Sequence, residues 1–231
     1  MHLWAKKHGK LQITAPSTYD QHLMKQGYEV EKIAHDYLIQ YMLPKYKNAE
    51  LLWQQTYTSG EYQSRADGII HDLDSDTYDL YEIKSSTSEK KDHLPDATFQ
   101  SIVIGDFLTI GSIHLVLLND EYVRGDSLDI EQLFKVPDVT SDVNEMTSTV
   151  LSQMREALRI VKSDSSATVL NCFNPKDCPC LNLCHPNLPQ YSIYNIPNLT
   201  PKKRRELEEA KTIAIDDVDL NFSFTPKQQK I

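Results

Sequence analysis

The sequence predicts a mixed α/β domain followed by a small cysteine-rich segment. Three observations lead to this prediction. Apolar residues recur at helical spacing near the N-terminus, two strand-like runs are joined by a polar turn, and all four cysteines lie in the last third of the chain. With 231 residues, 40% hydrophobic and 25% charged, the chain is long enough to bury a core and has the composition of a soluble globular protein.

The first predicted element is a long helix from Thr18 to Met42. Its apolar residues recur at helical spacing: Val30, Ile33, Ala34, Tyr37, Leu38 and Tyr41. Pro44 then stops the pattern. Gly27 lies inside this helix, where a glycine weakens the structure, so it predicts that the helix packs closely against the sheet.

Two strands are predicted next, roughly Arg65–His71 and Thr77–Lys84, joined by a polar turn. A second helix is expected to begin near Pro95, which suits a first helical position, and to run to about Leu108. The nearly all-apolar run 113–118 is expected to be a strand covered on both faces. Helix, hairpin, helix and strand in this order indicate a mixed α/β fold.

The C-terminal third predicts two further helices. One is expected to begin at Thr140, a residue suited to capping a helix, and a short one at Thr200-Pro201 carries the basic run 202–205. A serine-rich stretch between them predicts a linker. We therefore expect a core at residues 1–165 and, at residues 166–231, a cysteine-rich metal-binding segment with a C-terminal helix.

The predicted hairpin places two carboxylates opposite each other. If the turn is centred between Asp74 and Ser75, facing residues have numbers that sum to 149, as Asp67 and Glu82 do. Their Cβ atoms would lie roughly 5 Å apart, and a divalent cation such as Mg²⁺ would relieve the repulsion. Lys84 points to the same face, where it suits a bound water or phosphate charge. The alternative is an exposed strand start and a solvated Glu–Lys pair.

Two helices supply further candidates. Glu31 and His35 are four residues apart on the edge of the first helix's apolar stripe, so both could face the hairpin. Gln100 lies on the second helix. The alternative for His35 and Gln100 is an ordinary place on a helix surface.

The four cysteines, Cys172, Cys178, Cys180 and Cys184, all fall within 13 residues. No signal peptide or membrane-spanning run is evident, so we expect a cytoplasmic protein without a membrane partner. In that reducing compartment, clustered cysteines indicate a bound metal rather than disulfides. The net charge of −9 argues mildly against a nucleic-acid partner, although basic residues gather at 6–10 and 202–205.

Three runs together resemble the RecB-like branch of the PD-(D/E)XK nucleases: Arg65–Ile70, Leu80–Ser86 and Asp96–Gln100. That branch includes the iron–sulfur exonucleases of CRISPR adaptation and a group of uncharacterised bacterial proteins, to which the similarity is greater. It extends from about Leu3 to Val218, with Leu117–Arg124 and the stretch 172–197 as further matches.

The resemblance implies a restriction-endonuclease-like mixed sheet flanked by helices. It implies Mg²⁺ or Mn²⁺ held by Asp67, Glu82 and the Ile83 carbonyl, with Lys84 as the catalytic lysine. The family's helical Gly-x-x-x-(His/Glu) pattern falls on Gly27 and Glu31, which makes Glu31 the third acidic residue. Gln100 matches the family's helix glutamine, but the tyrosine that often follows it is missing.

The resemblance also implies a 4Fe–4S cluster on the cysteines. Relatives use three C-terminal cysteines, matched by Cys172, Cys178 and Cys184, and one cysteine just before a Leu-Trp pair. Here only Met1-His2 precede Leu3-Trp4, so either Cys180 is the fourth ligand or the chain begins late. Zinc, with His185 in reserve, is the alternative metal.

Three functions follow as hypotheses. The first is a metal-dependent deoxyribonuclease, in particular an exonuclease, that acts on single-stranded DNA or duplex ends and has a structural iron–sulfur cluster. The second is a catalytically inactive nucleic-acid- or partner-binding module of the same fold. The third is a redox-sensing cluster protein. Relatives often continue into a further domain, so a C-terminal domain absent from this chain is also expected.

Overall fold

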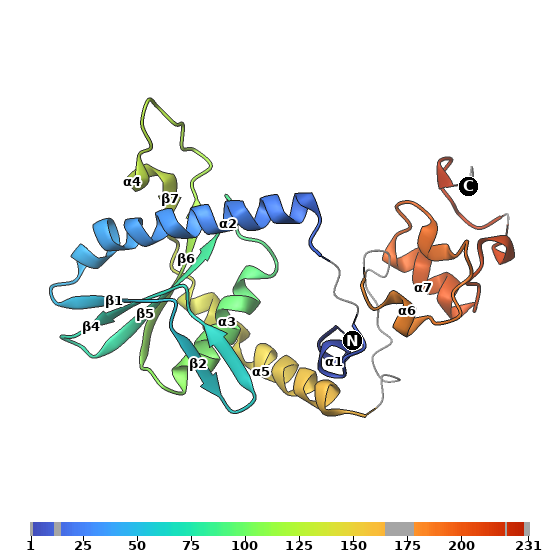
Figure 1. Cartoon of the computed structure of the whole chain (residues 1–231), viewed down its shortest axis with the longest axis horizontal. Coiled ribbons are helices and arrows are strands. Elements are labelled where there is room, and N and C mark those ends of the chain that lie inside the picture. Colours follow the sequence, from blue (N-terminus) through green and yellow to red (C-terminus); the bar gives the residue numbers. More distant parts are fainter. Residues whose placement is uncertain (1, 12–14, 165–177, 220, 229–231) are drawn as a thin grey trace. The chain divides into compact units, whose positions relative to one another are not determined.

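The computed structural model describes residues 2–11, 15–164, 178–219 and 221–228 (Figure 1). The chain divides into two compact units. One comprises residues 15–156, and the other comprises residues 1–14 together with 157–231. Cys172 lies outside the described residues.

The larger unit contains a five-stranded sheet with the strand order β1-β4-β5-β6-β7. The strands are β1 (Ala49–Trp53), β4 (Gly68–Asp72), β5 (Thr77–Lys84), β6 (Ile110–Leu118) and β7 (Phe134–Lys135). Neighbouring strands are antiparallel except β5 and β6, which run parallel, so the sheet is mixed. A separate antiparallel hairpin consists of β2 (Thr56–Ser59) and β3 (Tyr62–Arg65).

Helices precede, connect and follow the strands of the sheet. Helix α2 (Thr18–Tyr37) begins at Ser17, whose side chain accepts from the Asp20 N–H in a capping box, and continues into a π-helical turn (Leu38–Met42) and a 3₁₀ turn (Leu43–Lys45). Helix α3 (His93–Gly105) links the parallel strands β5 and β6. The short α4 (Ile130–Leu133) precedes β7, and α5 (Thr140–Lys162) follows it.

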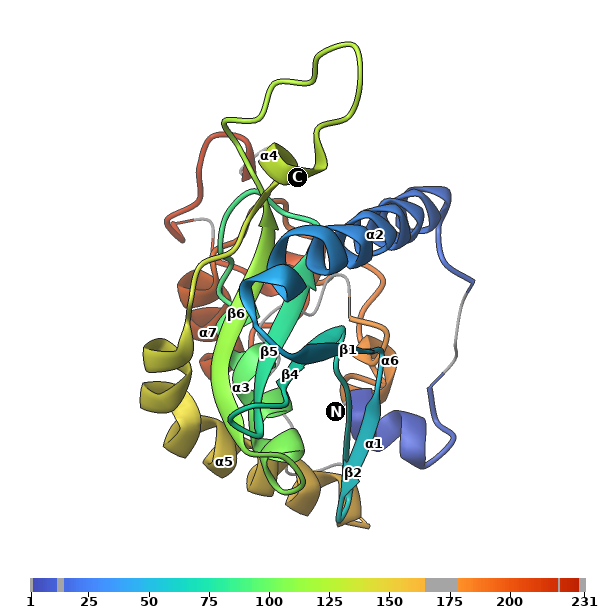
Figure 2. The same ribbon diagram turned by 90° about the vertical axis from the view of Figure 1, so that its left-hand side faces the viewer.

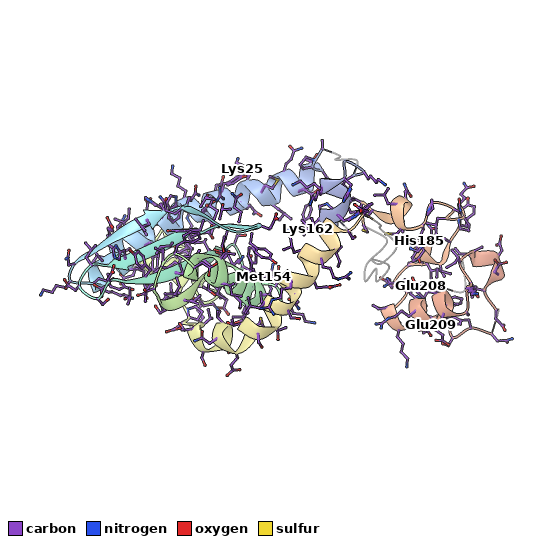
Figure 3. The ribbon with its side chains drawn as sticks, turned by 90° about the horizontal axis from the view of Figure 1, so that it is seen from below. Lys25, Met154, Lys162, His185, Glu208 and Glu209 are labelled. Atoms are coloured by element: carbon purple, nitrogen blue, oxygen red, sulfur yellow. The ribbon has the colours of Figure 1, made fainter. Side chains whose placement is uncertain are left out.

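Helices cover both faces of the sheet, with α2 over one face and α3 and α5 over the other (Figure 2). Because strand side chains alternate, Leu80 packs toward α3 and α5, whereas Tyr81 packs toward α2. Val116 on β6 is fully buried beneath α2. Met154 on α5, labelled in Figure 3, packs with Val103 of α3. This arrangement confirms the mixed α/β class and is consistent with a restriction-endonuclease-like fold.

The hairpin register is confirmed. Gly68 pairs with Tyr81, Ile70 with Asp79 and Asp72 with Thr77, so every pair sums to 149. The first strand begins at Gly68 and not at Arg65, because Arg65 ends the separate strand β3. The prediction that Gly27 allows close packing is wrong, since a Cβ added there would meet nothing within 4 Å.

A polar network fixes the start of β5. The Tyr46 hydroxyl donates to Asp79 Oδ2 at 2.5 Å and lies 3.1 Å from the Tyr81 hydroxyl. The other Asp79 oxygen accepts from the Ser112 N–H at 2.7 Å, which links β5 to β6. A Cβ at Gly111 would lie 2.6 Å from that same oxygen, so only glycine fits there.

The smaller unit contains α1 (His2–Lys7), α6 (Leu181–Cys184), α7 (Pro201–Glu209) and two 3₁₀ turns (Ile193–Asn195 and Ile215–Asp217). The predicted helix start at Thr200 is confirmed, because the Thr200 side chain accepts from the Lys203 N–H. A small core surrounds Ile193, Tyr194, Ile196 and Leu207. Among the described helices of the chain, none is both long and apolar enough to cross a membrane.

Candidate active site

Two carboxylates, those of Asp67 and Glu82, lie near each other at the end of the β4–β5 hairpin that is farthest from its turn. Asp67 directly precedes β4, and Glu82 lies near the end of β5, where the observed register would place the two residues opposite each other. Asp67 Oδ2 accepts from the Ile83 N–H at 2.9 Å, so its side chain leans onto β5. Glu82 is 7% exposed, which is unusual for a carboxylate.

Burial raises the pKa of both carboxylates, and a neighbouring negative charge reinforces the rise in each. Burial, followed by the negative charge of Asp67, raises the pKa of Glu82 to about 8. Burial likewise raises the pKa of Asp67, opposed by the Ile83 N–H and reinforced by the charge of Glu31. A site that holds negative charge out of water in this way favours a bound cation.

Lys84 and Gln100 converge on Glu82. The Lys84 ammonium lies 2.7 Å from Glu82 Oε1, and the Gln100 amide donates to Glu82 Oε2 at 2.5 Å. Lys84 also forms an ion pair with Asp96, at the start of α3. Burial alone would lower the pKa of Lys84, but the charges of Glu82 and Asp96 raise it. Glu82 and Lys84 share a face of β5 with Leu80, which packs against α3, and Asp96 and Gln100 reach them from that helix.

A cavity of about 290 Å³ lies on the α2 side of Asp67. Its walls include Glu31 from α2, Asp67, and Ile83 from β5. The Gln54 amide donates to Glu31, which fixes this carboxylate at the cavity wall. His35 instead packs edge-on against Trp53, with ring centroids 4.6 Å apart. Asp67 therefore borders both Glu82 and the cavity that Glu31 lines.

These residues supply suitable oxygen ligands but not a preformed cage. Among the described residues, no three His, Cys, Asp or Glu side chains are arranged to hold a metal ion. Mg²⁺ keeps several of its waters and commonly uses only one or two carboxylates, so the donor set of Asp67, Glu82 and the Ile83 backbone fits such an ion.

The structure brings two further residues to the site that the sequence analysis did not select. Asp96 lies four residues before Gln100 on α3, so helical spacing could have pointed to it. Gln54 has a left-handed backbone, with φ of 52°, which turns the chain after β1. No sequence signal marks Gln54, because its role depends on the strand β1 that the sequence analysis did not predict.

Three of the cysteines lie together in the smaller unit. Cys180 is fully buried in a cluster with Trp4 and Ala5, and the partly buried Cys178 and Cys184 pack against that cluster. Burial, followed by the neighbouring Cys178 and Cys184 thiols, raises the pKa of Cys180. The Trp4 indole donates to the Ser163 carbonyl at 2.8 Å, which holds α1 beside the end of α5 within this unit.

No known family model matches the chain, and no curated protein matches it. Its fold is similar to the crystal structure of an alkaline exonuclease, LHK-Exo, from Laribacter hongkongensis, with 14% identity, a TM-score of 0.39 and coverage of 69% of this chain and 79% of that one. The same enzyme in complex with dAMP gives a TM-score of 0.40 at the same identity and coverage. Both similarities are low, and the case for a function lies in the residues of the site.

Proposed function

We propose that this chain is a metal-dependent deoxyribonuclease of the PD-(D/E)XK type that hydrolyses phosphodiester bonds at DNA ends. One observation carries the proposal. The buried Glu82 carboxylate accepts hydrogen bonds from Lys84 and Gln100, and it lies beside Asp67 at the end of the β4–β5 hairpin away from the turn. Burying a carboxylate beside a second one costs free energy, and a bound divalent cation would offset that cost.

Each residue has a defined task in this proposal. Asp67, Glu82 and the Ile83 carbonyl would hold Mg²⁺ or Mn²⁺, which would stabilise negative charge on the phosphate undergoing hydrolysis. Gln100 fixes the orientation of Glu82. Lys84 carries a positive charge that can orient the attacking water or stabilise the developing phosphate charge. Glu31 supplies a further carboxylate from the cavity side.

The cysteines would form a structural metal centre, either a 4Fe–4S cluster or zinc. Cys178, Cys180 and Cys184 already gather beside Trp4, and Cys172 is the remaining thiol in the sequence. If zinc is the metal, His185 would bind it through Nδ1, because its Nε2 lies 3.2 Å from the Tyr194 hydroxyl, which in turn donates to Glu208. Figure 3 labels His185 and Glu208.

The test is a cleavage assay on linear and circular DNA, single- and double-stranded, with Mn²⁺ or with EDTA. We expect cleavage of linear substrates with Mn²⁺ only, and its loss in Asp67→Asn. The matched control is Asp74→Asn, the same change at an exposed residue of the hairpin turn, which should cleave like the wild type. Tight DNA binding without cleavage would favour the alternative, an inactive nucleic-acid-binding module, and neither binding nor cleavage would refute both.

Metal analysis tests the cysteine centre separately. Anaerobically purified protein should contain iron and sulfide, and Cys180→Ala should lower both. Unchanged cluster content in that variant would exclude Cys180 as a ligand, and stoichiometric zinc without iron would overturn the cluster.

A further inference from the structure

One wall of the cavity beside Asp67 carries an exposed aromatic side chain, that of Tyr28. Met24, Gly27, Tyr28 and Glu31 line it from α2, at the spacing of one helix face. Tyr28 is 62% exposed and Met24 50%, so neither serves the core of this unit. Gly27 also lines the cavity and has open space where a Cβ would be.

The opposite wall includes a positively charged side chain, that of Arg65. Arg65, Asp67, Ile83 and Ser85 line it from the strand side. Arg65 is two residues before Asp67 and is exposed, and its charge acts on the Asp67 carboxylate. An anionic group between Arg65 and the carboxylates would therefore meet a guanidinium on one side and, in the proposed function, a divalent cation on the other.

We propose that Tyr28 stacks on the base of an unpaired nucleotide whose phosphate is bound between Arg65 and Asp67, so that the enzyme selects single-stranded or frayed DNA ends. The inference rests on the proposed function, because the nuclease site supplies the second phosphate contact. It adds a base-binding residue and a substrate class to that site.

Size and chemistry favour one unpaired nucleotide over other occupants. The cavity, at about 290 Å³, lies near the lower end of small-ligand pockets, which run from roughly 300 to 1,000 Å³. Bases within a duplex are already stacked on their neighbours, whereas the face of an unpaired base is free for an aromatic side chain. A tyrosine, a guanidinium and a cation-binding carboxylate match the base and the phosphate of one nucleotide.

The same helix provides a matched control. Tyr19 is 70% exposed and lies nine residues before Tyr28, which corresponds to roughly half a turn around the helix, on the opposite face. Replacing either tyrosine by alanine removes the same atoms from the same exposed helix. Only the Tyr28 replacement removes a side chain from the cavity wall.

The experiment measures binding apart from cleavage. Anisotropy of a labelled single-stranded oligonucleotide and of a blunt duplex of the same sequence would be recorded with Ca²⁺ replacing Mn²⁺. We expect Tyr28→Ala to weaken single-strand binding by about tenfold, Tyr28→Phe to bind like the wild type, and Tyr19→Ala to be unchanged. Duplex binding should be insensitive to all three, and thermal unfolding of each variant checks that it folds.

Several results would overturn the inference: no single-strand binding by the wild type, equal effects of Tyr28→Ala and Tyr19→Ala, or equal losses for single strand and duplex. Cleavage with Mn²⁺ is scored separately. Tyr28-dependent binding without cleavage would keep the base contact and refute the nuclease, whereas cleavage with no Tyr28 effect would do the reverse.

Discussion

Replacing Glu82 by glutamine should make the metal-free protein more stable at alkaline pH. Glu82 is 7% exposed, and burial and Asp67 raise its pKa from 4.5 to about 8. At pH 8 and above the wild type must hold this charge beside Asp67 and away from water. The Glu82→Gln variant keeps an oxygen for Gln100, and Lys84 keeps its partner Asp96, so no new unpaired charge is created.

The magnitude follows from the pKa. A rise from 4.5 to about 8, at about 1.36 kcal/mol per pH unit, corresponds to at most about 5 kcal/mol. Water entering the site solvates part of the charge, so we expect a gain of at least about 2 kcal/mol. The sign follows from proton binding: between pH 4.5 and 8 the folded state retains a proton that the unfolded state has lost, so wild-type stability falls as pH rises through this window.

Urea denaturation in EDTA at pH 5.5 and pH 8 measures the effect. The difference between wild type and Glu82→Gln removes the contributions of the histidines, which titrate in both proteins. We expect the variant to gain stability relative to the wild type as pH rises, and Mn²⁺ to stabilise only the wild type. A variant that is less stable than the wild type at pH 8, or a difference that does not change with pH, would refute the reasoning.

Two further predictions concern other residues. Gly111→Ala should lower the free energy of unfolding by about 1–3 kcal/mol, because the added Cβ collides with the Asp79 carboxylate, 2.6 Å away; a chemical denaturation midpoint equal to the wild type's would contradict this. Asp96→Asn should leave Lys84 paired with Glu82 alone, so that Mn²⁺ competes with a stronger ion pair. The Mn²⁺ concentration for half-maximal cleavage should then rise by roughly fivefold, about 1 kcal/mol, and an unchanged requirement would show that Asp96 has no part in positioning Lys84.

The sequence predicted the hairpin well because its register depends on local information. A polar turn between two apolar runs fixes the pairing, and every observed pair obeys it. The strands β1, β2 and β3 were not predicted. β1 pairs with β4 across the intervening β2–β3 hairpin, so its partner is not local in the sequence. β2 and β3 pair only with each other and are largely polar, so they lack the apolar run that marks β4 and β5.

The residues of the candidate site also divide into those that the sequence predicted and those that it did not. Glu82, Lys84 and Gln100 were selected from sequence, and the structure brings them into contact. Asp96 and Gln54 were missed because each acts through one hydrogen bond to a residue distant in the sequence. Gly27 illustrates the converse error, since a helix glycine indicates that space is needed without saying whether a neighbouring element or a cavity occupies it.

The polar network at the start of β5 also determines what happens at the far end of that strand. Asp79 is bonded on one oxygen to Tyr46 and on the other to the backbone of β6, so β5 cannot slide along its own axis without breaking both bonds. A slide by a single residue would exchange the two sides of the strand and bring Ile83, an aliphatic side chain, to the place of Glu82. The anchor at Asp79 therefore sets which side chain faces Gln100, although it touches none of the residues there.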